Sequence, residues 1–243
     1  MYNPIIINEQ GFQEVWVKAI ELLDKYGWEH WNLVVHIQNP LLIDETFHSN
    51  MVQFTTANNI FKPKDVAYTI FPYNLYNGRG TANKLYSSYE RFYRWTRTRE
   101  HSGWGTYFRR MTHYEVNGEV INQLDNIITA INTRSTVSKA AYTIVIEQPG
   151  GETIRLMGAP CLNYLAVQVS PGNPPTLGML GIYRNHDFLH RAYGNYWGLC
   201  KLLYFLVIET NMAPGPLTCI SSHAYVSEKK TQLKSFIRGV NGK

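Results

Sequence analysis

Apolar side chains near the start of the chain recur every three or four residues, and this spacing predicts an amphipathic helix over residues 10–26. The apolar positions of that helix are Phe12, Val15, Trp16, Ala19, Ile20 and Leu23. Gly27 is the predicted stop, because glycine commonly follows the last helical residue. The next apolar run, over residues 31–38, is short, rich in strand-forming residues and ended by Asn39-Pro40. This run predicts a β-strand.

The middle of the chain carries a weaker pattern. Residues 63–77 predict a second helix, which Pro72 weakens because proline cannot donate a backbone hydrogen bond. Residues 78–112 are rich in Gly, Arg and Tyr without a clear period, so we expect long loops with short helical pieces there. Helical spacing returns at five positions that predict another amphipathic helix: Ile121, Leu124, Ile127, Ile128 and Ile131.

Strand patterns follow this helix. Residues 141–147 predict a strand that ends at the Pro-Gly-Gly turn 149–151. Residues 162–169 and 177–183 predict two further strands, joined across the short segment between them. Consecutive strands with a short connection commonly pair with each other, so we expect these two to be neighbours in a sheet.

One long stretch, residues 195–211, is apolar on nearly every side, which predicts a helix buried at the centre of the fold. The chain shows no internal repeat, no low-complexity linker and no break in composition. We therefore predict a single α/β (α+β) domain over residues 1–243, in which helices pack against a β-sheet.

Composition supports a folded protein, because 44% of the 243 residues are hydrophobic and only 17% are charged. The three cysteines, Cys161, Cys200 and Cys219, have no spacing typical of a metal site or a disulfide framework, and they fit a reducing compartment. The N-terminus lacks a signal-peptide pattern, and the apolar run near 199–208 is too short to span a bilayer. We expect a cytoplasmic protein that binds neither a membrane nor a metal.

Positive charge is unevenly placed along the chain, whose net charge is +5. No arginine precedes Arg79. Six more lie within the twenty residues 91–110: Arg91, Arg94, Arg97, Arg99, Arg109 and Arg110. Such a run favours a solvated face. The alternatives are a phosphate-facing loop or, because tyrosine and tryptophan lie between the arginines, a nucleic-acid-binding surface. The mild net charge suits anionic small molecules, so nucleic acid is not the partner that we expect.

The candidate chemistry begins at Cys161, which lies between a predicted turn and a predicted strand. A lone cysteine is most often a small buried side chain, whereas a reactive thiolate needs a nearby cation. Arg184 lies at the end of the next predicted strand, and strand pairing can bring its guanidinium near the thiol. The chain then continues through Asn185, Asp187 and Asn195 to His223-Ala224-Tyr225.

This ordered set resembles thymidylate synthase and its pyrimidine hydroxymethylase relatives. The family pattern runs Pro-Cys-His, then Gln-Arg-Ser-x-Asp-x-x-x-Gly-x-Pro-x-Asn, then His-x-Tyr, and the resemblance covers about residues 155–226. In the N-terminal half, residues 34–40 are similar to the early strand of the short archaeal members. The resemblance implies a mixed β-sheet packed with helices, one of them long and buried, and a homodimer whose sheets pack back to back.

The resemblance also implies the roles of the first residues of the set. Cys161 would add as thiolate to C6 of a pyrimidine nucleotide, which makes C5 a carbon nucleophile. Arg184 would bind the phosphate, with Asn185 as a hydrogen-bonding partner. Asp187 would position the base or a folate. From the sequence alone, the alternative for Arg184 is a surface arginine at a strand end, and the alternative for Asp187 is an aspartate that caps a turn.

The remaining residues of the set would read the base and the sugar. The amide of Asn195 can donate to uracil O4 and accept from N3–H, so asparagine favours uracil over cytosine. His223 and Tyr225 would hydrogen-bond the sugar hydroxyl. The alternatives are a helix N-cap for Asn195 and a strand with alternating faces for the other two.

Several positions depart from the family pattern. Leu162 stands where the family has histidine, and residues 191–194 replace its Gly-x-Pro. Lys139 is the remaining cation where a partner subunit of the family supplies two arginines. The catalytic glutamate is expected within residues 66–78, which contain no acid; Tyr73 and Tyr76 are candidate substitutes there.

Two further departures concern the proton transfer and the cofactor. Trp104 replaces the family tyrosine linked to proton removal at C5, and Tyr107 is the nearest substitute. Trp104 and Asp187 are the candidate folate contacts. Only 18 residues follow Tyr225, whereas longer family members close a C-terminal tail over folate.

The favoured interpretation is an enzyme that transfers a one-carbon unit from 5,10-methylenetetrahydrofolate to C5 of a uracil nucleotide, as a methyl or a hydroxymethyl group. The alternative within the same fold is a nucleotide-binding homologue without catalysis, because the glutamate and several arginines are missing. A third hypothesis is a Cys–His hydrolase that pairs Cys161 with His186 or His190.

Overall fold

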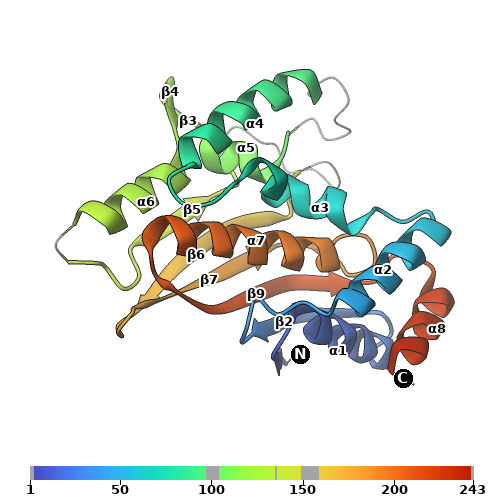
Figure 1. Ribbon diagram of the computed structural model, residues 1–243. Helices are drawn as coiled ribbons and strands as arrows, with labels where there is room; N and C mark the ends of the chain where they lie inside the picture. The colour runs from blue at the N-terminus through green and yellow to red at the C-terminus, as the bar shows by residue number, and fades with distance from the viewer. Residues whose placement is uncertain (1–2, 97–103, 135, 149–158, 242–243) are drawn as a thin grey trace.

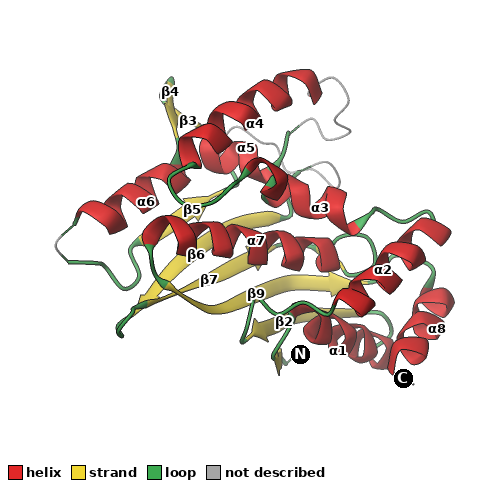
Figure 2. Cartoon of the chain, viewed as in Figure 1, coloured by secondary structure: helices red, strands yellow, loops and turns green. Residues whose placement is uncertain are grey.

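The structure is a computed structural model that describes residues 3–96, 104–134, 136–148 and 159–241. It has a mixed α/β architecture, in which helices pack against a large sheet (Figures 1 and 2). The predicted α/β class is therefore confirmed. The predicted turn at 149–151, together with Arg97 and Arg99, lies outside the described residues.

The sheet brings together strands from both ends of the chain. Its path runs β1 (Ile5–Glu9), β2 (Glu29–Ile37), β9 (Ala213–Tyr225), β7 (Thr176–Tyr183), β6 (Leu162–Ser170) and β5 (Tyr142–Val145), and β8 (His186–Asp187) also pairs with β9. The β1–β2, β7–β9 and β8–β9 pairs are parallel and the others are antiparallel. The hairpin of β3 (Tyr114–Val116) and β4 (Glu119–Ile121) forms a separate two-stranded sheet.

The helices are α1 (Phe12–Lys25), α2 (Glu45–Ala57), α3 (Pro63–Ile70), α4 (Ala82–Thr96), α5 (Tyr107–Thr112), α6 (Gln123–Thr133), α7 (Ala192–Thr210) and α8 (Lys230–Asn241), with a short 3-10 turn η1 (Tyr73–Leu75). Figure 2 shows α7 lying along the sheet, with α3 beside it. The long apolar helix predicted from the sequence is thus confirmed as the central helix, and it begins three residues earlier than expected.

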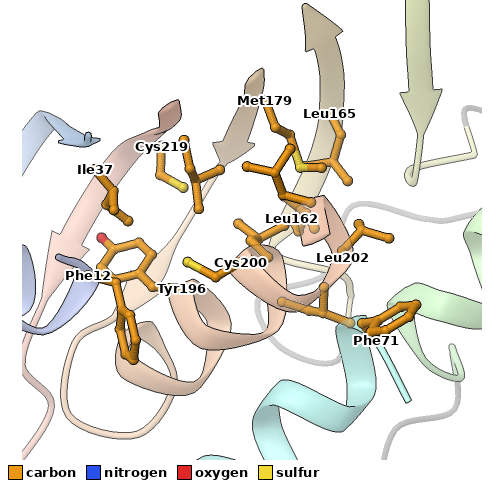
Figure 3. Close-up of a cluster of buried hydrophobic side chains, with 14 of the residues drawn as sticks. Phe12, Ile37, Phe71, Leu162, Leu165, Met179, Tyr196, Cys200, Leu202 and Cys219 are labelled. Carbon is orange, nitrogen blue, oxygen red and sulfur yellow. The ribbon is translucent and has the colours of Figure 1, made fainter. Parts of the chain in front are cut away.

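The core lies between α7 and the sheet. Alternate residues of β2 and β9 are buried, which is typical of strands with one face toward a core. Figure 3 shows Tyr196, Cys200 and Leu202 of α7 close to the sheet residues Cys219 and Met179. Because α7 is covered on nearly all sides, its sequence has no polar stripe.

Two expectations about the middle of the chain are wrong. The predicted helix 63–77 ends at Ile70, because Pro72 lacks the backbone donor and residues 73–75 form only the 3-10 turn. Residues 78–112 are not mainly loop, since α4 alone has 15 residues. The sequence also failed to indicate β1, α2 and α8. Among the fully buried side chains of α4 are Leu85 and Tyr89, so its apolar stripe is narrow and partly made of tyrosine.

Within the described residues, no helix has the length and hydropathy needed to cross a membrane. The same part of the chain contains no cluster of three or more His, Cys, Asp or Glu side chains able to hold a metal ion.

Candidate active site

The thiol of Cys161 lies at the start of β6, beside the end of β7. Leu162 of β6 pairs with Tyr183 of β7, and the N–H of Arg184 donates to the Cys161 carbonyl at 2.9 Å. The Arg184 Nε donates to the Pro160 carbonyl at 3.0 Å, which holds the guanidinium against the thiol segment. Cys161 is only partly buried, whereas Cys200 and Cys219 are enclosed in the core.

Charge and burial act on the Cys161 thiol in opposite directions. Burial is the larger effect and raises its pKa, because a thiolate loses its hydration in apolar surroundings. The guanidinium groups of Arg184 and Arg191 lower the pKa, and the Asp187 carboxylate raises it. The net pKa of the resting thiol is raised. The two cations therefore limit the effect of burial and favour the thiolate that a nucleophile requires.

The Tyr107 hydroxyl contacts the backbone of the same segment. Thr106 caps α5 through a hydrogen bond from the Arg109 N–H, so Tyr107 opens the helix and points toward β6. Its oxygen accepts hydrogen bonds from the N–H groups of Cys161 (3.2 Å) and Leu162 (3.3 Å). Burial raises the pKa of Tyr107 to about 12, so the hydroxyl keeps its proton at neutral pH and can donate it in one further hydrogen bond.

Trp104 lies next to Tyr107, with 4.8 Å between the ring centroids. The Arg110 guanidinium lies 5.5 Å over the Trp104 ring and donates to the carbonyls of Trp104 and Ile146. These contacts tie the segment before α5 to the end of β5, and they place a half-buried aromatic ring near the thiol segment.

The predicted sugar-binding residues, His223 and Tyr225, form one connected group with Asn185, which was predicted to assist phosphate binding. The Asn185 Oδ1 lies 2.8 Å from the His223 Nδ1, and the His223 ring stacks on Tyr225 with centroids 5.2 Å apart. Burial raises the pKa of Tyr225, the charges of Asp187 and Cys161 raise it further, and a hydrogen bond with Asn185 lowers it. The structure thus brings these three side chains together near Cys161.

The Asp187 carboxylate is already engaged within the chain. One oxygen accepts from the N–H groups of Leu189 (2.9 Å) and His190 (3.2 Å), and the other accepts from the Ser227 hydroxyl at 2.8 Å. This is the turn-capping role that the sequence left open as an alternative. Asp187 therefore acts on the site through the turn that leads into α7 and through its charge.

Asn195 does not cap α7, so the N-cap alternative is wrong. Arg191 occupies the N-cap position, and Asn195 is the fourth residue of the helix. Its side chain is only 3% exposed, and its Nδ2 lies 3.0 Å from the His186 Nε2. The amide is therefore a buried polar group held by a second side chain.

Neither candidate histidine of a hydrolase dyad is bonded to the thiol in the described structure. His186 bonds to Ser221 and Asn195, and His190 pairs with Glu228 at 3.1 Å. Because a dyad needs hydrogen-bond contact between base and nucleophile, the Cys–His hydrolase hypothesis loses its support.

Lys139 and Tyr76, one of the two tyrosines proposed to replace the glutamate, lie elsewhere. The Lys139 carbonyl accepts from Val169, at the far end of β6, roughly 25 Å along the strand from Cys161. The Tyr76 hydroxyl donates to Glu209 near the end of α7, about 27 Å from its start. The Tyr73 ring lies 5.3 Å from Trp197. Tyr76 is thus wrong as a substitute acid at this thiol, and Lys139 can reach such a site only from a partner subunit.

Arg191 is the site residue that the sequence analysis missed. Its guanidinium lies 4.0 Å from the ring of Phe61, which is 50% exposed, and it makes no ion pair with the described residues. It lowers the pKa of Cys161, Tyr107 and Tyr225. The available signal was an arginine between Asp187 and Asn195, within the segment that departs from the family pattern.

Replacing Arg191 with glutamine is expected to move the pH profile of Cys161 alkylation to higher pH. The Arg191 cation lowers the thiol pKa and burial raises it, so removing the cation lets the pKa rise further. Less thiolate is then present at a given pH. Iodoacetamide labelling followed by mass spectrometry measures the profile, and Cys200 and Cys219 are protected by burial. Lysine at position 191 should restore most of the profile. An unchanged profile in the glutamine variant would show that Arg191 does not act on the thiol.

A separate pocket of about 160 Å³ opens beside α7, away from these groups. It is lined by Phe12, Pro40, Leu41, Leu42, Ile43, Trp197, Cys200, Lys201 and Tyr204. Cys161 is not part of its lining, and the nucleophile, cations and hydroxyls described above do not face it. We therefore assign the candidate chemistry to the Cys161 site.

Comparison with known proteins gives distant relatives. No family model matches the chain. A protein of Methanosarcina barkeri named "Putative thymidylate synthase" is 20% identical over 97% of this chain and 96% of its own length. Two others with the same name, from Methanococcoides burtonii and Methanosarcina acetivorans, are 26% and 24% identical over 56% of this chain and 58% and 59% of their own lengths. These matches support a distant thymidylate synthase-like family.

Proposed function

We propose that this distant relative of thymidylate synthase-like proteins transfers a one-carbon unit to C5 of a uracil nucleotide through a covalent adduct at Cys161. The observation that carries the proposal is the partly buried Cys161 thiol, with Arg184 and Arg191 acting on its charge and with Tyr107 and Tyr225 beside it. Cys161 directly precedes β6, Arg184 directly follows β7 and Arg191 is the N-cap of α7, whereas Tyr107 and Tyr225 belong to α5 and β9.

The residues of this chain would act in sequence. The Cys161 sulfur forms a bond to C6 of the pyrimidine, and the electron pair of the C5=C6 bond moves toward C5 and O4. Arg184 binds the phosphate with Asn185 as a hydrogen-bonding partner, and His223, which contacts Asn185, binds the sugar together with Tyr225. After C5 has formed its new carbon bond, loss of the C5 proton and cleavage of the bond between that carbon and the donor nitrogen would leave an exocyclic methylene on the ring. Uptake of hydride, which the donor would supply, would give a methyl group, and uptake of hydroxide from water would give a hydroxymethyl group; in both cases the sulfur leaves C6 and the C5=C6 double bond is restored. The neutral Tyr107 hydroxyl would donate a hydrogen bond during these proton transfers.

The one-carbon unit is supplied by 5,10-methylenetetrahydrofolate when that cofactor is bound. The residues present have the chemistry to bind a planar ring with an acidic tail, because Phe61 and Trp104 are partly exposed aromatic rings and Arg191 is a cation without an ion-pair partner among the described residues. Trp104 would hold the ring. Asp187 would contribute through the turn that it caps.

The experiment that tests this function combines the protein, methylenetetrahydrofolate and uracil ribo- and deoxyribonucleotides labelled with tritium at C5. Release of tritium, with a methylated or hydroxymethylated product identified by mass spectrometry, would support the proposal. The product also tells which of the two groups is transferred. Absence of both tritium release and product for every uracil nucleotide would refute it.

Two observations favour a second candidate, a nucleotide-binding homologue without catalysis. Residues 66–78 supply no carboxylate, and the resting thiol has a raised pKa. Titration calorimetry distinguishes the two functions. Nucleotide binding that is unchanged in a Cys161→Ser variant, together with no turnover by the wild-type protein, would support this second candidate.

A homodimer is the expected assembly, built on the sheet face opposite the core. Val34, Ile182 and Ile220 alternate with the core residues of β2, β7 and β9, and strand pairing places them side by side. Such an apolar surface suits an interface between two sheets. A partner chain would also be the only source of Lys139 for the site.

Replacing Ile220 with lysine should therefore weaken dimerisation by at least about tenfold, because a charge would be buried at the centre of the interface. Light scattering coupled to size-exclusion chromatography over a concentration series measures the change. Val120→Lys on β4, where the side chain is 58% exposed, is the matched control and should leave the assembly unchanged. A wild-type monomer at all concentrations would contradict the proposed dimer.

A further inference from the structure

Behind the candidate base-reading residue lies a short chain of buried polar side chains. The His186 Nδ1 is 2.9 Å from the Ser221 Oγ, and the His186 Nε2 is 3.0 Å from the Asn195 Nδ2. The three residues are 1%, 1% and 3% exposed, for His186, Ser221 and Asn195 respectively. They come from β8, β9 and α7, so the network links the sheet to the central helix.

His186 is neutral in this environment. Its ring stacks on Tyr183 with centroids 4.0 Å apart and planes 4° apart, and Phe188 and Tyr196 pack around it. Burial lowers its pKa to about 3, because the charged imidazolium would lose its hydration. A neutral imidazole has one donor nitrogen and one acceptor nitrogen. The ring can therefore make two hydrogen bonds, one to an acceptor and one from a donor.

The orientation of the Asn195 amide in the structure indicates which nitrogen carries the proton. The Asn195 Nδ2 can only donate, so the His186 Nε2 facing it must accept. The proton then resides on Nδ1 and is donated to the Ser221 hydroxyl oxygen. A flipped Asn195 amide would place its oxygen against the lone pair of Nε2. The opposite tautomer, with the proton on Nε2, would instead donate to the oxygen of the flipped amide, so the tautomer of His186 and the orientation of the Asn195 amide are coupled.

The orientation of this amide matters for a pyrimidine ring. The Asn195 Oδ1 makes no hydrogen bond with the described residues, so it and the second N–H of Nδ2 remain available to a ligand. Uracil presents an acceptor at O4 and a donor at N3, whereas cytosine presents a donor at N4 and an acceptor at N3. An amide that can flip can match either edge, and an amide held in one orientation can match only one.

We propose that His186 is a positioning residue that holds the Asn195 amide in the orientation matching uracil, so that the site discriminates against cytosine nucleotides. The inference rests on the proposed function, because it assumes that Asn195 contacts the base. It adds a residue from outside the set indicated by the family pattern, and it gives the buried Ser221 hydroxyl a part in specificity.

Replacing His186 with phenylalanine tests this role. Phenylalanine keeps an aromatic ring against Tyr183 but offers no acceptor to Asn195. We expect the preference for a uracil over a cytosine monophosphate, measured as a ratio of dissociation constants by calorimetry, to fall by about tenfold or more. Glutamine at this position can still accept from Asn195 and should retain more of the preference. His48→Asn is the control, because His48 bonds to Tyr193, which lies on the opposite side of α7 from Asn195, and loss of this bond should leave the ratio unchanged.

A second measurement does not depend on any ligand. The nitrogen chemical shifts of the His186 ring in the wild-type protein should show the tautomer with the proton on Nδ1, and a proton on Nε2 would overturn the proposal. An unchanged base preference in folded His186→Phe protein would overturn it as well, while leaving the proposed function intact. If the wild-type protein shows the expected tautomer but binds neither nucleotide, the proposed function fails and the specificity role fails with it.

Discussion

A Cys161→Ser variant should lose turnover by more than about a thousandfold while still binding the nucleotide. The serine hydroxyl stays protonated at neutral pH, so the bond from residue 161 to C6 of the pyrimidine cannot form. Binding should persist because Arg184, Asn185 and Tyr225 remain in place around a side chain of nearly the same size. Tritium release from C5 measures turnover, and calorimetry measures binding.

The matched control for this variant is Cys200→Ser, which changes a thiol enclosed in the core. It should lower stability, because a polar hydroxyl replaces a buried apolar group, but it should keep the turnover of the folded protein. Comparable loss of turnover in both variants would mean that the Cys161 effect is structural. Full turnover in the Cys161→Ser variant would refute covalent catalysis at this residue.

A Gly194→Ala variant should lower the free energy of unfolding by about 1–3 kcal/mol, because it overpacks the contact between α3 and α7. A Cβ atom on Gly194 would lie 2.6 Å from the Val66 Cβ and 2.9 Å from the Pro63 carbonyl oxygen. One turn later, a Cβ on Gly198 would lie 2.8 Å from the Ala67 carbonyl oxygen. These backbone atoms can move away only if α3 shifts as a whole. Urea unfolding followed by circular dichroism measures the change.

The control for the glycine variant is Gly239→Ala in α8, where no atom lies within 4 Å of the added Cβ. This change should be neutral or stabilise the helix, because alanine has the higher helix propensity. Adding Val66→Ala to Gly194→Ala removes the Val66 Cγ1 at 2.9 Å but keeps the Val66 Cβ at 2.6 Å, so it should recover only part of the lost stability. Wild-type stability of the single Gly194→Ala variant would contradict the close contact between the two helices.

The sequence predicted an element correctly where the hydrophobic pattern of that element alone reports how it is buried. The 3.6-residue period of α1, the alternation in β2 and the all-round apolar character of α7 each report how much of that element is buried. The proximity of Cys161 and Arg184 was also accessible, because their strands follow one another and pair as neighbours. The sequence failed at α4, whose buried stripe is narrow and whose remaining positions are polar or charged.

Periodicity along the chain determined the class of fold, the central helix and the segment that carries the candidate chemistry. Only the tertiary structure decided which distant groups meet there: the Tyr107 hydroxyl bonds to a residue 54 positions away, and Ser221 bonds to a histidine 35 positions away. It also placed Arg191 beside Phe61 and left Lys139 at the opposite end of β6. The physical reason is that a hydrophobic pattern records whether a face is covered but not which side chain covers it, and that choice depends on how separate elements pack.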